Sequence, residues 1–407
     1  MPHRQFDALA NDGFREDPYP VLAAMREHHP VYALSPGLIE SWHIFRYDDV
    51  RHVLLSPDLF SSDRSLQGSG DIADANLGFL FNNMISATGD KHRRLRMIGN
   101  RVFMAKAIES FRPAVQKVVD ERMAFALGVD TFDLVEDFAA EITVAMICAV
   151  LGLPRSDMPM IRKWTAVLGE NSGAVTWLPE IDPATVETGR RAGIEMTDYF
   201  RKFLSERRSK GHEGDLLTAF ETVEVEGQRL TEDEVLSMAM LLLLAGNETT
   251  TNLITNFVRL LDAFPEQAHL LRRGDLPVSG AVEETLRMRN SIRNVDRFAL
   301  QDVTMHGQTI PKGALVVVWL TAANCDPAVF DDPDSFRPDR QPNRHLAFGQ
   351  GAHMCLGSAL ARMETQIAAD AILSRTARID LPEPPHLGRN ANFDNVTRQI
   401  ARFSPCR

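Results

Sequence analysis

Apolar residues recur at intervals of three and four along much of the chain, the spacing that places them on one face of an α-helix. Residues 47–55 and 132–153 follow this pattern, and Pro154 is expected to end the second helix. The longest such stretch, residues 231–264, begins with the Thr-x-x-Glu form of a capping box. At about 1.5 Å per residue this helix would be about 45 Å long, so we expect it to cross the interior.

Short apolar runs bounded by turn residues indicate some β-structure as well. Residues 42–46 predict one strand, and residues 303–305 and 315–320 predict others around a turn at His306-Gly307. The chain is therefore predicted to be mainly α with a small β portion. The helix-rich core is expected at about 85–290 and 355–375, and the β-rich portions at about 30–60 and 295–320.

Composition narrows the class of protein. The 407 residues are 44% hydrophobic and contain no linker-like stretch, which favours one large domain over residues 1–407. A net charge of −11 disfavours nucleic acid and anionic membrane surfaces as partners. The N-terminus lacks an apolar signal region, no apolar run approaches the length that spans a bilayer, and the four cysteines are scattered. We expect a cytoplasmic monomer.

The most informative segment, residues 348–357, reads FGQGAHMCLG and precedes a helical pattern. Glycines let the backbone turn sharply and approach a flat ligand closely. A cysteine beside a helix N-terminus gains from the partial positive charge there, which favours the thiolate and so a metal ligand. An isolated cysteine would more simply be a buried apolar residue, but the flanking glycines favour the ligand interpretation.

This segment resembles the haem-binding signature of the cytochrome P450 superfamily, in the positions of Phe348, Gly349, His353, Cys355 and Gly357. The resemblance implies the triangular, single-domain P450 fold with haem b as cofactor. It also implies that Cys355 is the axial ligand of the haem iron.

The middle of the predicted central helix reads AGNET at residues 245–249, where polar side chains interrupt an apolar interior. It is similar to the superfamily segment in which an acid and an alcohol support proton delivery during dioxygen activation. The resemblance assigns these roles to Glu248 and Thr249 and places Ala245 and Gly246 against the haem. Alternatively, Thr249 bonds back to a carbonyl of the preceding turn and Glu248 is solvated.

Further matches extend the resemblance along the chain. Glu284 and Arg287 share one helical face, and with Arg340 they resemble a superfamily network that stabilises the fold. Haem propionates need donors, and the family positions for that task are matched by His92, Arg96, Arg297 and His353, with His345 as a fifth candidate.

Two departures from the family pattern affect the expectations. Cys325 stands where the family commonly has arginine, which puts local stability or electron transfer in doubt. After Arg287, the chain reads NSIRNV, and Ile292, Arg293 and Asn294 are predicted to line the substrate pocket. We hypothesise that Arg293 pairs with a substrate carboxylate. The alternative is that it pairs with an acid of the protein or with a propionate.

Apolar loops supply further pocket candidates, although they also read as packed lids. Phe81 is the first choice among them. The others are Leu77, Phe79, Leu80, Val175, Trp177 and Leu178.

The resemblance implies a monooxygenase that hydroxylates a small to medium-sized hydrophobic substrate, including one with an acidic or polar group. Electrons would pass from NAD(P)H through ferredoxin reductase to a ferredoxin, which docks at the basic patch of residues 90–96. Three alternatives stay open: a peroxide-using or non-redox haem-thiolate enzyme, a haem-based sensor or carrier, and a helical binding protein without haem.

Overall fold

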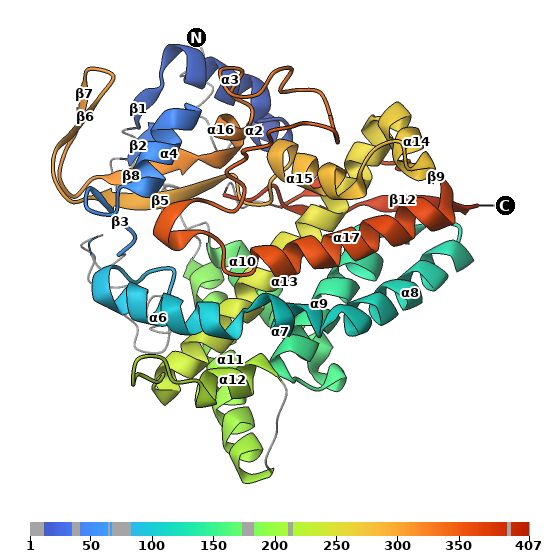
Figure 1. Ribbon diagram of the computed structural model, residues 1–407, viewed down its shortest axis with the longest axis horizontal. Coiled ribbons are helices and arrows are strands. Elements are labelled where there is room, and N and C mark those ends of the chain that lie inside the picture. The colour runs from blue at the N-terminus through green and yellow to red at the C-terminus, as the bar shows by residue number, and fades with distance from the viewer. Residues whose placement is uncertain are drawn as a thin grey trace.

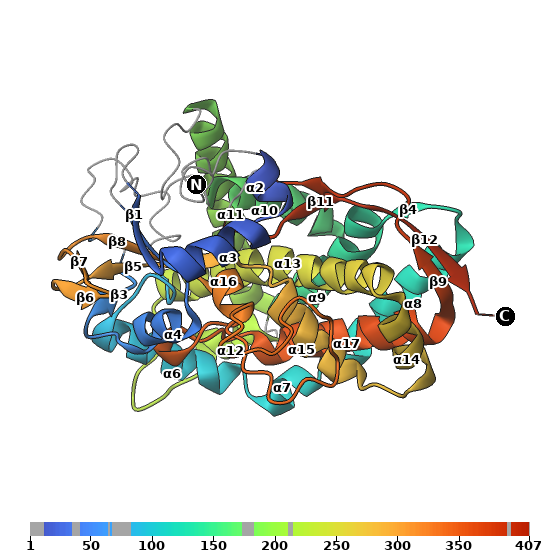
Figure 2. The same cartoon turned by 90° about the horizontal axis from the view of Figure 1, so that it is seen from above.

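The structure is a computed structural model that describes residues 12–34, 41–63, 66, 83–172, 183–210, 215–388 and 392–406. Helix α13 (Glu232–Ala263) crosses the middle of the molecule, as both views show (Figures 1 and 2). Its predicted capping box is confirmed, because Thr231 accepts from the Glu234 amide and the Glu234 carboxylate accepts from the Thr231 amide. The predicted long central helix is therefore correct in both position and length.

Helices pack around α13 on several sides. Those in contact with it are α9 (Ala140–Leu151), α10 (Met158–Ser172), α11 (Pro183–Lys210), α12 (Leu216–Thr222), α14 (Pro265–Arg273), α15 (Val278–Met288) and α17 (Ser358–Arg375). The other α-helices of the described residues are α2 (Asp12–Glu16), α3 (Tyr19–His28), α4 (Tyr47–Leu55), α6 (Gly89–Val102), α7 (Ala105–Glu109), α8 (Arg112–Gly128) and α16 (Leu320–Asn324), of which α16 is entirely buried. One apolar core fills the space between the central helices, including buried residues of α8, α9, α13 and α17.

The predicted helix over 132–153 is in fact several elements. A short strand β4 (Phe132–Asp133) is followed by the π-helix η2 (Leu134–Ala139) and then by α9. The Asp133 carboxylate accepts from the Val135 amide at 3.0 Å, so it starts the helical turn after the strand. Gly152, with φ of +67°, ends α9 before Pro154, and the short helix η3 (Arg155–Asp157) follows.

The main sheet has the strand order β1-β2-β8-β5-β3, with β2 and β8 parallel and the other pairs antiparallel. Its strands are β1 (Val31–Leu34), β2 (Ser41–Ile44), β3 (Phe60–Ser61), β5 (Asn294–Ala299) and β8 (Leu315–Trp319). Strand β8 is buried along its whole length because apolar clusters cover both faces of the sheet.

The described residues also form three smaller sheets. They are β6 (Val303–Met305) with β7 (Gln308–Ile310), β10 (His386–Leu387) with β11 (Val396–Arg398), and β4 with β12 (Ile400–Pro405) and β9 (Thr376–Asp380). The predicted class, mainly α with a small β portion, is confirmed. Within the described residues, no helix combines the length and apolar character that crossing a bilayer requires.

Candidate active site

The loop of residues 346–357, here the Cys355 loop, leads into the N-terminus of α17. Its backbone angle φ is +66° at Gly349 and +75° at Gly351, a region that residues with a Cβ rarely adopt. The loop therefore turns back on itself, and the Cys355 amide donates to the Phe348 carbonyl oxygen at 2.8 Å. This fold presents Cys355 just before α17.

Opposing influences act on the Cys355 thiol. Burial raises the pKa of this thiol, whereas the Gly357 amide N–H and the Arg96 and Arg362 guanidinium groups act to lower its pKa. The expected effect of the helix N-terminus is therefore present, but burial outweighs it. A metal cation bonded to the sulfur would favour the thiolate, because metal binding displaces the thiol proton.

Four cationic or ionisable side chains converge beside the Cys355 loop. They are His92 and Arg96 on α6, Arg297 on β5, and His353 in the short helix η4 (Gly351–His353). The ring centroids of His92 and His353 are 4.0 Å apart, and Arg96 donates to the Met354 carbonyl oxygen. The structure thus brings together the four main predicted propionate donors from three separate parts of the chain.

These four groups disfavour one another's positive charge. Burial first, and then Arg297, His92 and Arg96, lower the pKa of His353 to about 3, and burial lowers the pKa of Arg297 to about 10. Within the described residues, none of the four forms an ion pair with a carboxylate, and the buried His92 Nε2 has no hydrogen-bond partner. Such a cluster fits an anionic ligand, as the two carboxylates of haem would be.

The midpoint of α13 differs from the rest of the helix. Ala245 is exposed, whereas Leu243 and Asn247 on either side are buried. Gly246 serves helix packing, because a Cβ there would lie 3.3 Å from the Ile147 side chain of α9. An exposed alanine halfway along a core helix is what a flat cofactor lying against α13 requires.

Thr249 and Glu248 have specific partners. The Thr249 hydroxyl donates to the Ala245 carbonyl oxygen at 2.6 Å, which is the local bond of the alternative interpretation. The Glu248 carboxylate is not simply solvated, since it accepts from Asn395 Nδ2 at 2.7 Å. The Ser291 hydroxyl donates to the Thr249 carbonyl oxygen at 2.6 Å and fixes this turn of α13.

Arg293 does not fit the predicted role as a substrate-binding residue. Its side chain is 4% exposed and forms an ion pair with Asp394 at 2.9 Å. A buried carboxylate of the protein already pairs with this guanidinium, which is the arrangement that the alternative for Arg293 describes. The hypothesis of an acidic substrate group loses its support with it.

The neighbours of Arg293 have different surroundings. Ile292 is partly buried and forms a β-bridge with Phe393. Asn294 pairs with Trp319 in the register of β5 and β8, and side chains alternate along a strand. Asn294 and Arg297 therefore lie on opposite faces of β5, which argues against the predicted pocket position of Asn294.

Glu284 lies at the centre of a buried polar network. Its carboxylate accepts from Arg287 Nη2 at 2.8 Å, from Arg340 Nε at 2.9 Å and from Asn343 Nδ2 at 3.0 Å. Glu284 and Arg287 have no exposed surface. Cys325 is buried nearby at the end of α16, and burial raises the pKa of its thiol to about 11. The structure thus brings the three predicted network residues together.

His345 has partners that exclude its predicted role. Its Nε2 lies 3.0 Å from Glu283 Oε2, and its Nδ1 accepts from the Ala347 amide. Arg362 donates to the same Glu283 carboxylate. Since both ring nitrogens are used within the protein, His345 has no donor left for a propionate.

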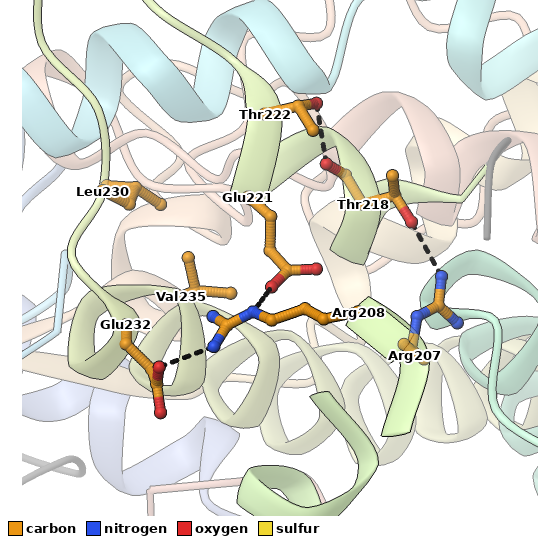
Figure 3. A pocket seen from close by; sticks show the side chains of 8 residues that line it. All are labelled: Arg207, Arg208, Thr218, Glu221, Thr222, Leu230, Glu232 and Val235. Carbon is orange, nitrogen blue, oxygen red and sulfur yellow. Dashed lines mark hydrogen bonds and ion pairs between the residues drawn. The ribbon is translucent and has the colours of Figure 1, made fainter. Parts of the chain in front are cut away.

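A separate pocket of about 320 Å³ lies between α11, α12 and the start of α13 (Figure 3). Arg208 crosses it and contacts Glu221 at 2.8 Å and Glu232 at 2.7 Å. The charges of Arg208, Glu221 and Glu232 are already paired, and no residue of the Cys355 site lines this pocket. The pocket is therefore distinct from the Cys355 site.

The predicted loop residues of the pocket lie outside the described residues. These are Phe81, Leu77, Phe79, Leu80, Val175, Trp177 and Leu178.

Comparisons with known proteins agree with this geometry. The sequence profile of the family described as Cytochrome P450 matches residues 13–273 and 269–377. Cytochrome P450 109 of Bacillus spizizenii is 36% identical over 92% of this chain and 88% of its own, and the cytochrome P450 monooxygenase PikC of Streptomyces venezuelae is 35% identical over 94% and 89%. The crystal structure of P450BioI with an acyl carrier protein carrying hexadec-9Z-enoic acid superimposes with a TM-score of 0.89, at 29% identity over 96% of this chain and 99% of that one. This chain belongs to the cytochrome P450 family.

Proposed function

We propose that this cytochrome P450 is a haem b monooxygenase that receives electrons from a ferredoxin and hydroxylates a small to medium-sized hydrophobic substrate. NAD(P)H would supply the electrons through a ferredoxin reductase. The observation that carries the proposal is the position of Cys355, in a glycine-rich turn just before α17 and beside the cationic cluster that includes Arg96. Its four cysteines are unpaired, as is typical of a reducing compartment, so we place the enzyme in the cytoplasm.

In this proposal three groups of residues would hold haem. Cys355 would ligate the iron, and Ala245 would lie against the haem. His92, Arg96, Arg297 and His353 would bind the propionates. The bound haem supplies the activation of dioxygen, and the protein supplies orientation and electrostatics.

Glu248 and Thr249 take the role of moving protons to the reacting site. Glu248 is partly exposed on α13 with its carboxylate fixed by Asn395. The Thr249 hydroxyl donates to Ala245 and retains two oxygen lone pairs that can accept. A carboxylate and a hydroxyl adjacent in sequence on one helix can thus form a short proton path.

The proposed substrate is hydrophobic and needs no acidic group, because Arg293 already binds Asp394. Related structures support this class. One is CYP109E1 from Bacillus megaterium in complex with testosterone, with a TM-score of 0.82, and the P450BioI complex carries a fatty acyl chain. The test of this substrate class compares ligands in matched pairs, each pair a long-chain alcohol and the corresponding carboxylic acid. The affinity of each ligand is measured from the spin-state shift of the haem during a titration. Equal or tighter binding of the alcohols is expected, whereas a uniform preference for the acids would contradict it.

The haem-thiolate assignment is tested by the reduced carbon monoxide difference spectrum. The unchanged protein is expected to show the long-wavelength Soret band of thiolate-ligated haem, and Cys355→Ala is expected to lose it. Cys406→Ala is the matched control, since that cysteine is exposed and should keep the band. A band that survives Cys355→Ala would refute the assignment, and with it the proposed function.

The proposed ferredoxin surface is the exposed cationic face of α6 and α7. Helix α6 contacts the Cys355 loop, because Arg96 donates to Met354 and a Cβ at Gly99 would lie 3.0 Å from Leu356. The predicted patch of residues 90–96 is weaker than its composition indicated, because Arg94 pairs with Glu234 and Arg93 with Asp90. Exposed cations available for docking on these helices include Arg101 and Lys106.

Charge reversal at these positions tests the docking surface. Arg101→Glu and Lys106→Glu are expected to slow reduction by an acidic ferredoxin several-fold at low salt, and high salt should shrink the difference. Lys117→Glu, an exposed lysine on α8, is the control. Equal slowing by the control and the two variants would place the docking surface elsewhere.

A further inference from the structure

A row of polar side chains on α13 connects Glu248 to a segment near the C-terminal end of the chain. Glu248, Asn252 and Asn256 are four residues apart, so they lie on one face of the helix. All three contact residues 392–396: Asn395 Nδ2 donates to Glu248 at 2.7 Å, the Val396 amide donates to Asn252 at 3.1 Å, and Asn256 donates to Asp394 at 3.3 Å. We call residues 392–396 the C-terminal clamp.

A second part of the chain holds the C-terminal clamp from the other side. The Asp394 amide donates to the Ser291 carbonyl oxygen at 2.9 Å, and the Arg293 amide donates to the Asn392 carbonyl oxygen at 2.7 Å. The side chains of Arg293 and Asp394 are paired and nearly fully buried. The backbone of the C-terminal clamp is therefore fixed against both α13 and the segment between α15 and β5.

Asn395 reaches the proposed proton-delivering carboxylate with its side chain, because its Nδ2 donates to one Glu248 carboxylate oxygen at 2.7 Å. A hydrogen bond to an ionised group is roughly twice as strong as one between neutral groups. It is therefore strong enough to select one orientation of the Glu248 side chain.

Gly388 makes room for this arrangement. Its amide donates to the Asn395 carbonyl oxygen at 2.8 Å, and a Cβ at residue 388 would lie 2.8 Å from Asn395 Nδ2. A methyl group there would displace the Asn395 amide without removing it. The chain thus offers a second, independent way to disturb the contact between Asn395 and Glu248.

We propose that Asn395 is a positioning residue for proton delivery, holding the Glu248 carboxylate in place through the hydrogen bond from its side-chain amide. The proposal rests on the proposed function, because Glu248 has this role only in a dioxygen-activating enzyme. The C-terminal clamp also contacts Ile292 through the bridge to Phe393, and Ile292 belongs to the segment predicted to line the pocket.

The first test compares Asn395→Ala with Glu248→Gln in the holoenzyme. The measured quantity is product formed per NAD(P)H consumed, with the solvent isotope effect on turnover. Loss of a hydrogen bond to a charged group predicts a fall on the order of tenfold for Asn395→Ala, and a larger solvent isotope effect. Gly388→Ala should shift both quantities in the same direction by a smaller factor.

Asn395→Asp gives a readout that a purely structural role would not produce. Aspartate has nearly the shape of asparagine but donates a hydrogen bond only when protonated. The Asn395→Asp variant should therefore recover product yield as the pH is lowered, whereas the Asn395→Ala variant should not. Among the described residues, the charged groups near this contact are Asp394 on the C-terminal clamp itself, Arg293 just before β5, Arg289 after α15 and Arg259 on α13. All four are retained in every variant, so their contribution is common to the comparison.

A measurement independent of turnover follows the Glu248 carboxylate itself. Infrared difference spectra across a pH titration, with Glu248→Gln used to assign the band, report the protonation of this group. Asn395→Ala should raise the pKa of Glu248, because a donor that favours the charged form is lost. Asn252→Ala, which removes a clamp contact but not the Glu248 contact, should lower thermal stability and leave that pKa unchanged.

The outcomes separate the two hypotheses. If Glu248→Gln changes neither product yield nor the isotope effect, the proposed role of Glu248 is wrong. If Glu248→Gln changes both, but Asn395→Ala and Gly388→Ala leave yield, isotope effect and the infrared titration unchanged, the role of Asn395 is wrong and that of Glu248 stands.

Discussion

Asp394→Asn is expected to destabilise the fold more than Arg293→Met, although the two side chains form one ion pair. After Arg293→Met, Asp394 keeps Arg289 at 4.0 Å and the amide of Asn256 at 3.3 Å. After Asp394→Asn, Arg293 is 4% exposed and has lost its counter-charge. The arginines at 289 and 259, which also act on Asp394, would then add repulsion.

The magnitudes follow from the general cost of breaking a buried pair. Removing one partner of a buried ion pair costs about 3–5 kcal/mol, which we expect for Asp394→Asn. Arg293→Met should cost about 2 kcal/mol, near the loss of one charged hydrogen bond. The double variant should cost about 1–3 kcal/mol less than the sum of the two.

Denaturant-induced unfolding of the holoenzyme measures these differences. The control is Arg273→Met, which breaks the pair between Arg273 and Asp275 at 2.9 Å, where the side chains are 64% and 46% exposed. An exposed pair should change stability by less than about 1 kcal/mol. An Arg293→Met variant with unchanged stability and selectively weaker binding of carboxylate ligands would show that Arg293 binds substrate and not mainly Asp394.

Three further outcomes are expected. Glu284→Gln should lower the free energy of unfolding by about 3–5 kcal/mol, since two buried guanidinium groups lose their shared charge; a denaturation midpoint equal to that of the unchanged protein would contradict this. Burial raises the pKa of Glu283, but hydrogen bonds from its arginine and histidine partners outweigh burial and lower that pKa from 4.5 to about 2. The contribution of Glu283 to stability is therefore complete above its ordinary pKa of 4.5 and is lost as the pH falls toward 2. Glu283→Gln should accordingly flatten the pH dependence of the melting temperature between these two values. Gly351→Ala should reduce haem retention more than Gly307→Ala: φ is positive at both, but only at 351 would the Cβ meet a carbonyl oxygen, at 2.7 Å. Equal retention in the two alanine variants would show that backbone angle alone matters.

Features that depend on local sequence were predictable. The capping box at Thr231, the length of α13 and the position of Cys355 before a helix follow from residues that are close together in the chain. The predicted helix over 132–153 failed locally, because Asp133 starts a new turn and Phe132 pairs with Ala401 far along the sequence.

Features that depend on long-range pairing were not predictable. The sequence left two alternatives for Arg293, because nothing near it identifies Asp394 as its partner. The face of Asn294 depends on the register of β5, and a shift of one residue reverses it. The contact between Asn395 and Glu248 was not predicted. The available signal was the spacing of Glu248, Asn252 and Asn256 in an otherwise apolar helix.

The separation along the chain between the clamp and α13 has a consequence for biosynthesis. Asn395 follows Glu248 by 147 residues, and a ribosome adds about 5–20 residues per second. For roughly 7 to 30 seconds of translation, the polar face of α13 therefore exists without the segment that covers it. Lower growth temperatures and co-expressed chaperones should accordingly raise the yield of haem-loaded enzyme more than they raise the yield of total protein.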